Sequence, residues 1–273
     1  MNINIKILYF SPTGTTKKVL EGIVEGINPK SANFVNLQKQ HVNLDIDESS
    51  TDLVLIGVPT YANRIPPEAM IELKKINGNG IPAVLVAVYG NNKFGTILLE
   101  MKNIAKYTNL IPVAAAAFIG EHSFSTKEMP IALGRPDAKD MSKAQSFGKS
   151  IKSKIKNIHL ANFDLQVPGE LPHRVWNKIP AQPPETDENI CIKCGKCVEA
   201  CPVNTISITE SVNTDQSKCI FCCACVKVCP TSARSVTDAK LLEIRERLYN
   251  NCKERKEPEI FMENTATDKS QIN

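Results

Sequence analysis

The first 160 or so residues alternate short apolar runs with stretches whose apolar residues recur at helical spacing. The apolar runs lie at 5–10, 53–58, 83–88 and 113–119, with a weaker run at 33–37. Between them, apolar residues return every three or four positions at 19–27, 69–76, 97–105 and 141–158, which predicts amphipathic helices. Continuous apolar strands between such helices indicate a parallel sheet covered on both faces. This pattern predicts a doubly wound α/β domain with a five-stranded parallel sheet over residues 1–165.

Residues 166–186 break this alternation. They hold the prolines Pro168, Pro172, Pro180, Pro183 and Pro184. Because proline blocks helix interiors and central strands, the segment predicts an extended linker. We expect Trp176 to pin this linker to a domain surface. A second domain is predicted at 187–237, followed over 238–273 by a helix at 239–253 and a charged tail that frays from residue 254.

Cysteine divides the chain at the same place. Of ten cysteines, nine lie between Cys191 and Cys229, and the first 190 residues have none. The N-terminus shows no export signal, so we expect a cytoplasmic protein whose thiols are reduced and bind metal. No apolar run reaches the roughly 18 residues of a membrane span. The net charge of +4 is too small to indicate nucleic acid as a partner.

The motif C-x2-C-x2-C-x3-C-P occurs twice, with an offset of 28 residues at every cysteine. A loop of this spacing supplies three thiolates to one cubane cluster, and the fourth thiolate comes from the other half. One predicted [4Fe-4S] cluster therefore has the ligands Cys191, Cys194, Cys197 and Cys229. The second has the ligands Cys219, Cys222, Cys225 and Cys201. A zinc module is the alternative, but zinc sites usually take pairs of C-x2-C rather than triplets.

The cysteine module resembles bacterial two-cluster ferredoxins, small α+β domains, over about 50 residues. Cys223 departs from that pattern, since it stands where the other half has Gly195 and where these ferredoxins often have glycine. We expect a small buried side chain there; a distorted loop or a tuned second cluster is the alternative. Cys252 has no predicted role.

A hydroxyl-rich turn connects the first strand to the first helix. It contains Ser11, Thr13, Gly14, Thr15 and Thr16. A phosphate in this turn would meet helix N-terminal N–H groups, the positive end of the helix dipole and several hydroxyl donors. An ordinary helix cap needs only one hydroxyl, so the excess predicts phosphate binding, and the Walker pattern of nucleoside triphosphate sites is absent. The turn resembles the FMN-phosphate loop of flavodoxins.

Two further loops follow the third and fourth strands, at the carboxyl ends where open sheets bind ligands. The predicted FMN-binding residues in these loops are Pro59, Thr60, Tyr61, Asn63, Tyr89, Gly90, Asn91, Phe94 and Gly95. By their resemblance to flavodoxins, the loops would clasp the isoalloxazine ring, with Tyr61 and Phe94 as the candidates for stacking. His122, on a fourth loop, is expected to be an ordinary surface histidine; a flavin neighbour is the alternative.

Taken as a whole, residues 1–237 resemble the flavodoxin–ferredoxin fusion proteins of anaerobic bacteria and archaea. The resemblance implies FMN, two [4Fe-4S] clusters and electron transfer between a low-potential donor and an acceptor, with redox partner proteins that the sequence does not identify. One alternative is a flavin-dependent reductase of a small molecule, for which His122, Arg64 and Glu121 are the candidate proton donors. Another is a scaffold whose first domain has lost FMN.

Formal charge indicates how the two domains are held together. Residues 1–165 carry a net charge of +5 and residues 185–240 a net charge of −1, so electrostatic attraction between them should be modest. The proline-rich linker is expected to keep them close by tethering. We therefore expect electrons to pass between the clusters and FMN within one chain.

Overall fold

The computed structural model of the protein describes residues 3–38, 44–156, 158, 160, 163–173, 175 and 179–263. Its first domain is built on five parallel strands: β1 (Asn4–Tyr9), β2 (Ser31–Asn36), β3 (Leu53–Pro59), β4 (Pro82–Tyr89) and β5 (Ile111–Ile119). Their order in space is β2-β1-β3-β4-β5. This is the flavodoxin-like order of doubly wound sheets, so the predicted fold class is confirmed.

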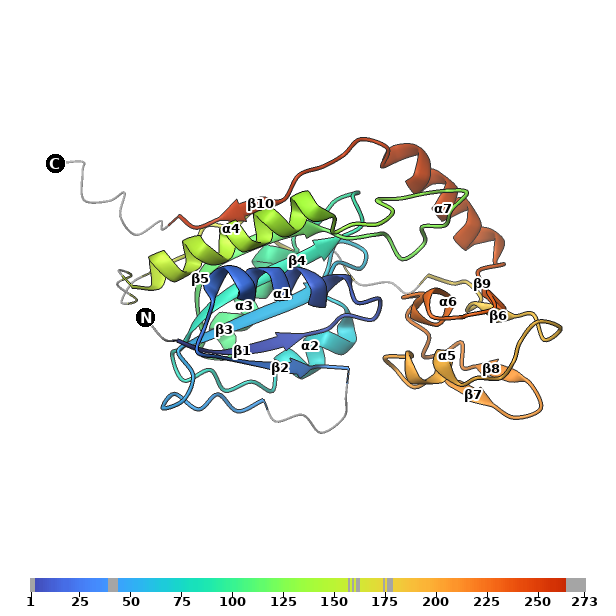
Figure 1. The fold of residues 1–273 in the computed structure, drawn as a ribbon, viewed down its shortest axis with the longest axis horizontal. Helices are drawn as coiled ribbons and strands as arrows, with labels where there is room; N and C mark the ends of the chain where they lie inside the picture. Colours follow the sequence, from blue (N-terminus) through green and yellow to red (C-terminus); the bar gives the residue numbers. More distant parts are fainter. Residues whose placement is uncertain are drawn as a thin grey trace.

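Four helices cover the two faces of this sheet (Figure 1). They are α1 (Thr15–Ile27), α2 (Pro67–Leu73), α3 (Ile97–Tyr107) and α4 (Ala138–Ile155). Helices α1 and α4 bury their apolar stripes, including Ile23 and Phe147, in one core. Helices α2 and α3 bury Leu73 and Met101 in the core on the opposite face. The carboxyl ends of the parallel strands, with the loops that follow them, form one end of the sheet, which we call the rim.

A sixth strand joins the sheet from the end of the chain. Strand β10 (Glu259–Phe261) pairs antiparallel with β5, so Ile260 lies opposite Ala116. The expectation that the tail frays from residue 254 is therefore wrong for 254–263; residues 264–273 lie outside the described part. Backbone hydrogen bonds to β5 hold this short strand within a mostly charged segment, and composition alone does not reveal this.

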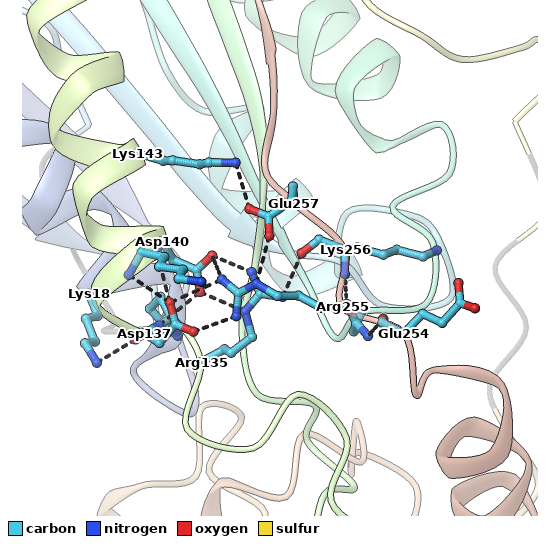
Figure 2. Close-up of polar contacts among 12 residues, drawn as sticks. Lys18, Arg135, Asp137, Asp140, Lys143, Glu254, Arg255, Lys256 and Glu257 are labelled. Carbon is cyan, nitrogen blue, oxygen red and sulfur yellow. Dashed lines mark hydrogen bonds and ion pairs between the residues drawn. The ribbon is translucent and has the colours of Figure 1, made fainter.

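Ion pairs fasten residues 252–263, which we call the C-terminal strap, to the first domain. Figure 2 shows Arg255 beside Asp137 and Lys143 beside Glu257, with N–O distances of 2.6 and 2.7 Å. Arg135 donates to the backbone oxygen of Lys256 at 2.8 Å while it pairs with Asp140 in the interior. The strap is thus attached by side chains and by a strand.

The second domain repeats one unit twice. Its elements are β6 (Glu185–Thr186), α5 (Lys196–Glu199), β7 (Ile206–Ile208), β8 (Val212–Thr214), α6 (Ala224–Lys227) and β9 (Arg234–Ser235). Helix α6 lies 28 residues after α5, and β9 lies at the same offset from the start of β7. The pairs β6–β9 and β7–β8 are related in the same way. The duplication seen in the sequence is therefore a duplication of structure.

The chain passes between the two domains twice. After β9, helix α7 (Ala239–Asn251) runs along the second domain and leads into the strap that returns to the first (Figure 1). Trp176 of the linker lies outside the described residues, so its predicted contact with a domain surface stays untested. Among the described residues, no helix has both the length and the apolar character needed to cross a membrane.

Candidate functional site

A cavity of about 660 Å³, which we call the rim cavity, lies between the rim of the parallel sheet and the second domain. From the first domain, eight of the predicted FMN residues line it: Thr13, Thr15, Pro59, Thr60, Tyr61, Asn63, Tyr89 and Gly90. From the second domain, Cys219, Ile220 and Phe221 form the facing wall. The volume falls within the range of about 300–1,000 Å³ that is usual for small-molecule sites.

The hydroxyl-rich turn presents unsatisfied polar groups. The Oγ1 atoms of Thr16 and Thr60 are buried without a hydrogen-bond partner. Helix α1 starts at Thr15 with no side-chain cap and no acidic residue in its first turn. Buried hydroxyls usually have partners, and uncapped helix starts attract anions, so this end of the cavity suits a phosphate.

Three of the predicted residues in the turn shape it instead of lining the cavity. The Oγ atom of Ser11 accepts a hydrogen bond from the Lys17 backbone at 3.1 Å, and the Ser11 N–H donates to Gln38 at 2.9 Å. Gly14 adopts a left-handed φ of 83° at the start of α1. Thr16 is buried beneath the turn at 1% exposure.

Of the three aromatic residues predicted to bind FMN, two line the cavity. Tyr61 and Tyr89 line the cavity, but Phe94 does not. The Phe94 ring instead packs edge-on against Tyr89, with 5.5 Å between ring centroids. The partly buried Phe94 ring thus packs against the core and not along the cavity, and its flavin-stacking role stays an untested prediction. Tyr61 remains the stacking candidate.

Asn91 and Gly95, also predicted to bind FMN, do not line the cavity, and the structure gives each of them a structural contact. The buried Asn91 amide donates to the backbone oxygens of Cys252 and Glu254, at 2.8 and 2.7 Å, and its oxygen accepts from the Lys256 N–H at 3.1 Å. It is thus an anchor for the C-terminal strap. Gly95 has a left-handed φ of 64°, and an added Cβ would lie 2.3 Å from Asn63 Cβ, so glycine there lets two rim loops meet.

His122 stands in the cavity wall and not on an open surface, contrary to expectation. Its ring packs against Gly90, where an added Cβ would lie 2.2 Å from the His122 Cδ2. Its Nδ1 accepts a hydrogen bond from the Phe124 N–H at 3.0 Å. Burial lowers the pKa of His122 to about 4, and the Lys227 charge adds to this effect. The imidazole is therefore neutral at pH 7.

The other two proton-donor candidates are already engaged. Arg64 does not line the cavity, because its guanidinium forms an ion pair with the buried Glu100. Glu121 lines the cavity, but its carboxylate pairs with Lys227 of the second domain. Of the three candidate proton donors, His122 is thus the one that lines the cavity without taking part in an ion pair.

Two smaller cavities in the second domain gather the cysteines in the crossed arrangement. One is lined by Cys191, Cys194, Cys197 and Cys229. The other is lined by Cys201, Cys219, Cys222 and Cys225, together with Cys223. None of the ten cysteines forms a disulfide. Each half thus sends its fourth cysteine to the cavity of the other half, which is the grouping that the two-cluster motif predicts.

The two cysteine loops have matching backbones. Gly195 has a φ of 78°, and Cys223, at the equivalent position, has a φ of 56°. Cys223 is also buried, at 3% exposure, beside Phe221 and Leu241, so the expected small buried side chain is confirmed. Burial raises the pKa of its thiol to about 12.

Cys219 connects the two kinds of site. It lines both the rim cavity and the cysteine cavity of the second loop, as Val203 and Ile220 also do. On the opposite wall, burial raises the pKa of Tyr61 well above its ordinary value, and the neighbouring Cys222 and Cys223 contribute. A ligand in the rim cavity would therefore lie next to the second cysteine loop.

Helix α7 closes the cavity with residues that the sequence did not single out. Ile244, Arg247 and Leu248 of this helix line it, as does Ile179 of the linker. The sequence predicted a helix at 239–253 but not the surface against which it packs. The position of α7 depends on the strap, which pairing with β5 and the Asn91 hydrogen bonds hold in place.

Comparisons with known proteins found similarities for both parts of the chain. Residues 190–233 match the 4Fe-4S dicluster domain family. No curated protein sequence matches the chain. Among solved structures, a flavodoxin from the domain Archaea is similar over 57% of this chain and 100% of its own, with 15% identity and a TM-score of 0.40. A Streptococcus pneumonia TIGR4 flavodoxin is similar over 55% and 99%, with 14% identity and a TM-score of 0.40.

Another similar structure belongs to a longer protein. It is the rubredoxin oxygen:oxidoreductase from Desulfovibrio gigas, similar over 56% of this chain and 36% of that chain, with 16% identity and a TM-score of 0.39.

Proposed function

We propose that this chain, which joins a flavodoxin-like domain to a 4Fe-4S dicluster domain, transfers electrons between two [4Fe-4S] clusters and FMN within one molecule. The position of Cys219 carries the proposal. This one residue borders both the rim cavity and a cysteine cavity, so the two cofactor sites share a wall. The two domains would then form one redox unit.

The rim cavity supports FMN as its occupant. Thr13, Thr15 and Thr60 line it, and the hydroxyl of Thr60, like that of Thr16 in the hydroxyl-rich turn, is buried without a hydrogen-bond partner, which favours a phosphate there. Tyr61 offers aromatic surface for the isoalloxazine ring, while Ile220 and Phe221 close the side toward the second domain. Both faces of the ring would be shielded from water.

The crossed cysteine cavities support two clusters. When bound, FMN exchanges one or two electrons and each cluster exchanges one. The cysteines of the first cavity are the more accessible, since Cys194 is exposed, whereas Cys222 and Cys225 of the second are buried. We infer that an external redox partner meets the chain near Cys194 and that the second cavity lies between that point and the flavin.

A reductase of a small molecule is the second candidate, favoured by the position of His122. Its ring lines the cavity and is neutral at pH 7, so it could hold a hydrogen bond to a substrate beside the flavin. Turnover assays with candidate acceptors separate the two functions. A carrier would reduce protein or artificial acceptors without saturating at a small-molecule site.

The cofactor set is tested by an anaerobic reductive titration of the full chain. Two clusters and FMN together should take up about four electrons per chain. Flavin absent from a chain that holds full iron would favour the scaffold alternative. Zinc without acid-labile sulfide would refute the proposal.

The phosphate end is tested by Thr13→Ala combined with Thr15→Ala. Each hydroxyl is worth about 1.5–3 kcal/mol to a charged acceptor, so FMN affinity should fall by about two orders of magnitude or more. Riboflavin lacks the phosphate and should bind the variant as it binds the parent. Ser142→Ala with Ser146→Ala, on the exposed surface of α4, is the matched control. Unchanged FMN affinity in the threonine variant would place the phosphate elsewhere.

A further inference from the structure

Arg234 lies between the two cysteine cavities. It lines both of them, and no other residue in the described part of the chain does. Its side chain is 3% exposed. The guanidinium donates to Thr186 Oγ1 at 2.8 Å and to Thr214 Oγ1 at 2.9 Å, and its Nη2 lies 3.6 Å from Cys225 Sγ. One buried cation therefore spans both halves of the domain.

The internal duplication shows that the fold does not require this cation. At the offset of 28 residues, Thr186 corresponds to Thr214, and Arg234 corresponds to Ile206. Ile206 is buried at 7% exposure and starts the equivalent strand. The same structural position is thus filled by an apolar residue in one half and by a charged residue in the other.

The surroundings of Arg234 lack an ordinary counter-charge. Among the described residues, no carboxylate forms an ion pair with it. Its Nε is buried without a hydrogen-bond partner. A buried cation with no opposite charge nearby is strongly unfavourable. The negative charge that would balance it is that of cysteine thiolates holding iron–sulfur clusters in the two cavities, which Arg234 lines.

We infer that Arg234 raises the reduction potentials of both clusters, an inference that rests on the proposed function because it requires the clusters. Each cluster accepts one electron from a low-potential one-electron donor, which adds one negative charge to the cluster and its four thiolates. The fixed positive charge stabilises the reduced form more than the oxidised form. The effect is larger at the cluster of Cys219, because the guanidinium is within hydrogen-bond distance of Cys225.

The test is a potentiometric titration of the full holoprotein, followed by electron paramagnetic resonance, with iron, sulfide and flavin measured on each sample. In Arg234→Ile, which copies the other half, and in Arg234→Gln, the reduced-to-oxidised ratio of the Cys219 cluster at a fixed potential should fall at least about tenfold. For a one-electron couple this lowers the midpoint by about 59 mV. Arg234→Lys keeps the charge and should stay closer to the parent.

Lys240→Gln is the matched control, since it removes an exposed charge on α7 that lines neither cysteine cavity and that solvent screens. Its midpoints should not move. Equal midpoints in the parent, Arg234→Ile and Arg234→Gln, with full iron in each, would overturn the inference and leave Arg234 a purely structural link. If Arg234→Ile loses iron, the comparison of Arg234→Gln with Arg234→Lys decides in the same way. A parent protein without clusters would instead refute the proposed function.

Discussion

Lys227 of α6 forms an ion pair with Glu121, the residue that follows the last parallel strand by two positions, across the boundary between the two domains. The Lys227 ammonium also donates to the Ser125 backbone oxygen at 2.8 Å. The side chains are 30% and 22% exposed, so solvent screens the pair only in part. Glu121 lines the rim cavity as well, and the pair therefore links the closing of that cavity to the docking of the second domain.

A double-mutant cycle measures this link. Lys227→Gln and Glu121→Gln should each weaken FMN binding several-fold, and the double variant should be no weaker than the singles, with a coupling of about 1 kcal/mol. FMN dissociation constants at low and high salt give the numbers, and Lys240→Gln on the exposed surface of α7 serves as the control. Additive single effects would mean that the pair does not hold the domains together.

Asn91 fastens the strap, which leads to a second prediction. Asn91→Ala removes three hydrogen bonds to the strap backbone, each worth about 0.5–1.5 kcal/mol. Amide hydrogen exchange over residues 252–261 should quicken markedly, while FMN affinity should change far less than in the Thr13 and Thr15 variant. Asn103→Ala, exposed on α3, should change neither. If FMN affinity falls tenfold while exchange in the strap stays slow, Asn91 binds the flavin after all.

The crossed cysteine cavities give a third prediction. Cys201→Ala should remove the cluster otherwise held by Cys219, Cys222 and Cys225, so iron should fall from about eight to about four per chain. The remaining cluster should keep the spectrum of the Cys191 site. Cys252→Ala, whose side chain lines neither cavity, should retain all the iron. Loss of the Cys191 signal in Cys201→Ala would count against the crossed assignment.

His122 makes stability depend on pH. Its pKa is lowered from 6.5 to about 4 in the folded protein, so below pH 6.5 the unfolded chain binds a proton that the folded chain does not. The free energy of unfolding should therefore be highest above pH 6.5 and fall as the pH drops toward 4. Between pH 7.5 and 5.5 this loss should reach up to about 1.4 kcal/mol, less in proportion to the exposure of the ring.

His122→Asn provides the comparison for this pH effect. Urea unfolding of cluster-loaded protein at the two pH values should show a smaller loss for the variant than for the parent. Equal losses in both proteins would assign the pH dependence to other groups.

Local pattern was enough to predict most of the framework. The apolar runs at 53–58 and 83–88 are strands of the parallel sheet, and the offset of 28 residues between the cysteine motifs recurs in the backbone. The hydroxyl-rich turn and Tyr61 lie at the cavity because position at the carboxyl end of a strand is a local property. The hydroxyl content of a turn and its place after a strand are therefore enough to predict the part of the cavity wall that the first domain contributes.

Contacts between distant segments were not predictable in the same way. Asn91 and Cys252 are separated by 161 residues, and nothing near either residue indicates that they meet. The sequence around His122 indicates an exposed loop residue, because it does not show that the second domain and Gly90 surround this ring in the fold. A three-residue strand such as β10 has too few side chains to show a period, so its pairing depends on β5.

The strap also changes what cutting the linker should do. The linker alone was expected to keep the domains together, so cleavage near Pro180 would have separated them. Because β10 pairs with β5 and Arg255 pairs with Asp137, a chain cut near Pro180 should still hold both domains in one complex. Separation should require loss of residues 254–263 as well.

The most direct test of the account is the rate at which electrons pass between the clusters and FMN after flash reduction of the clusters, followed at a flavin wavelength. Because Cys219 borders both the rim cavity and a cysteine cavity, the rate should be independent of protein concentration and only weakly dependent on salt, in the intact chain and in the chain cut near Pro180. A rate that rises in proportion to protein concentration in the intact chain would show transfer between molecules and contradict the account.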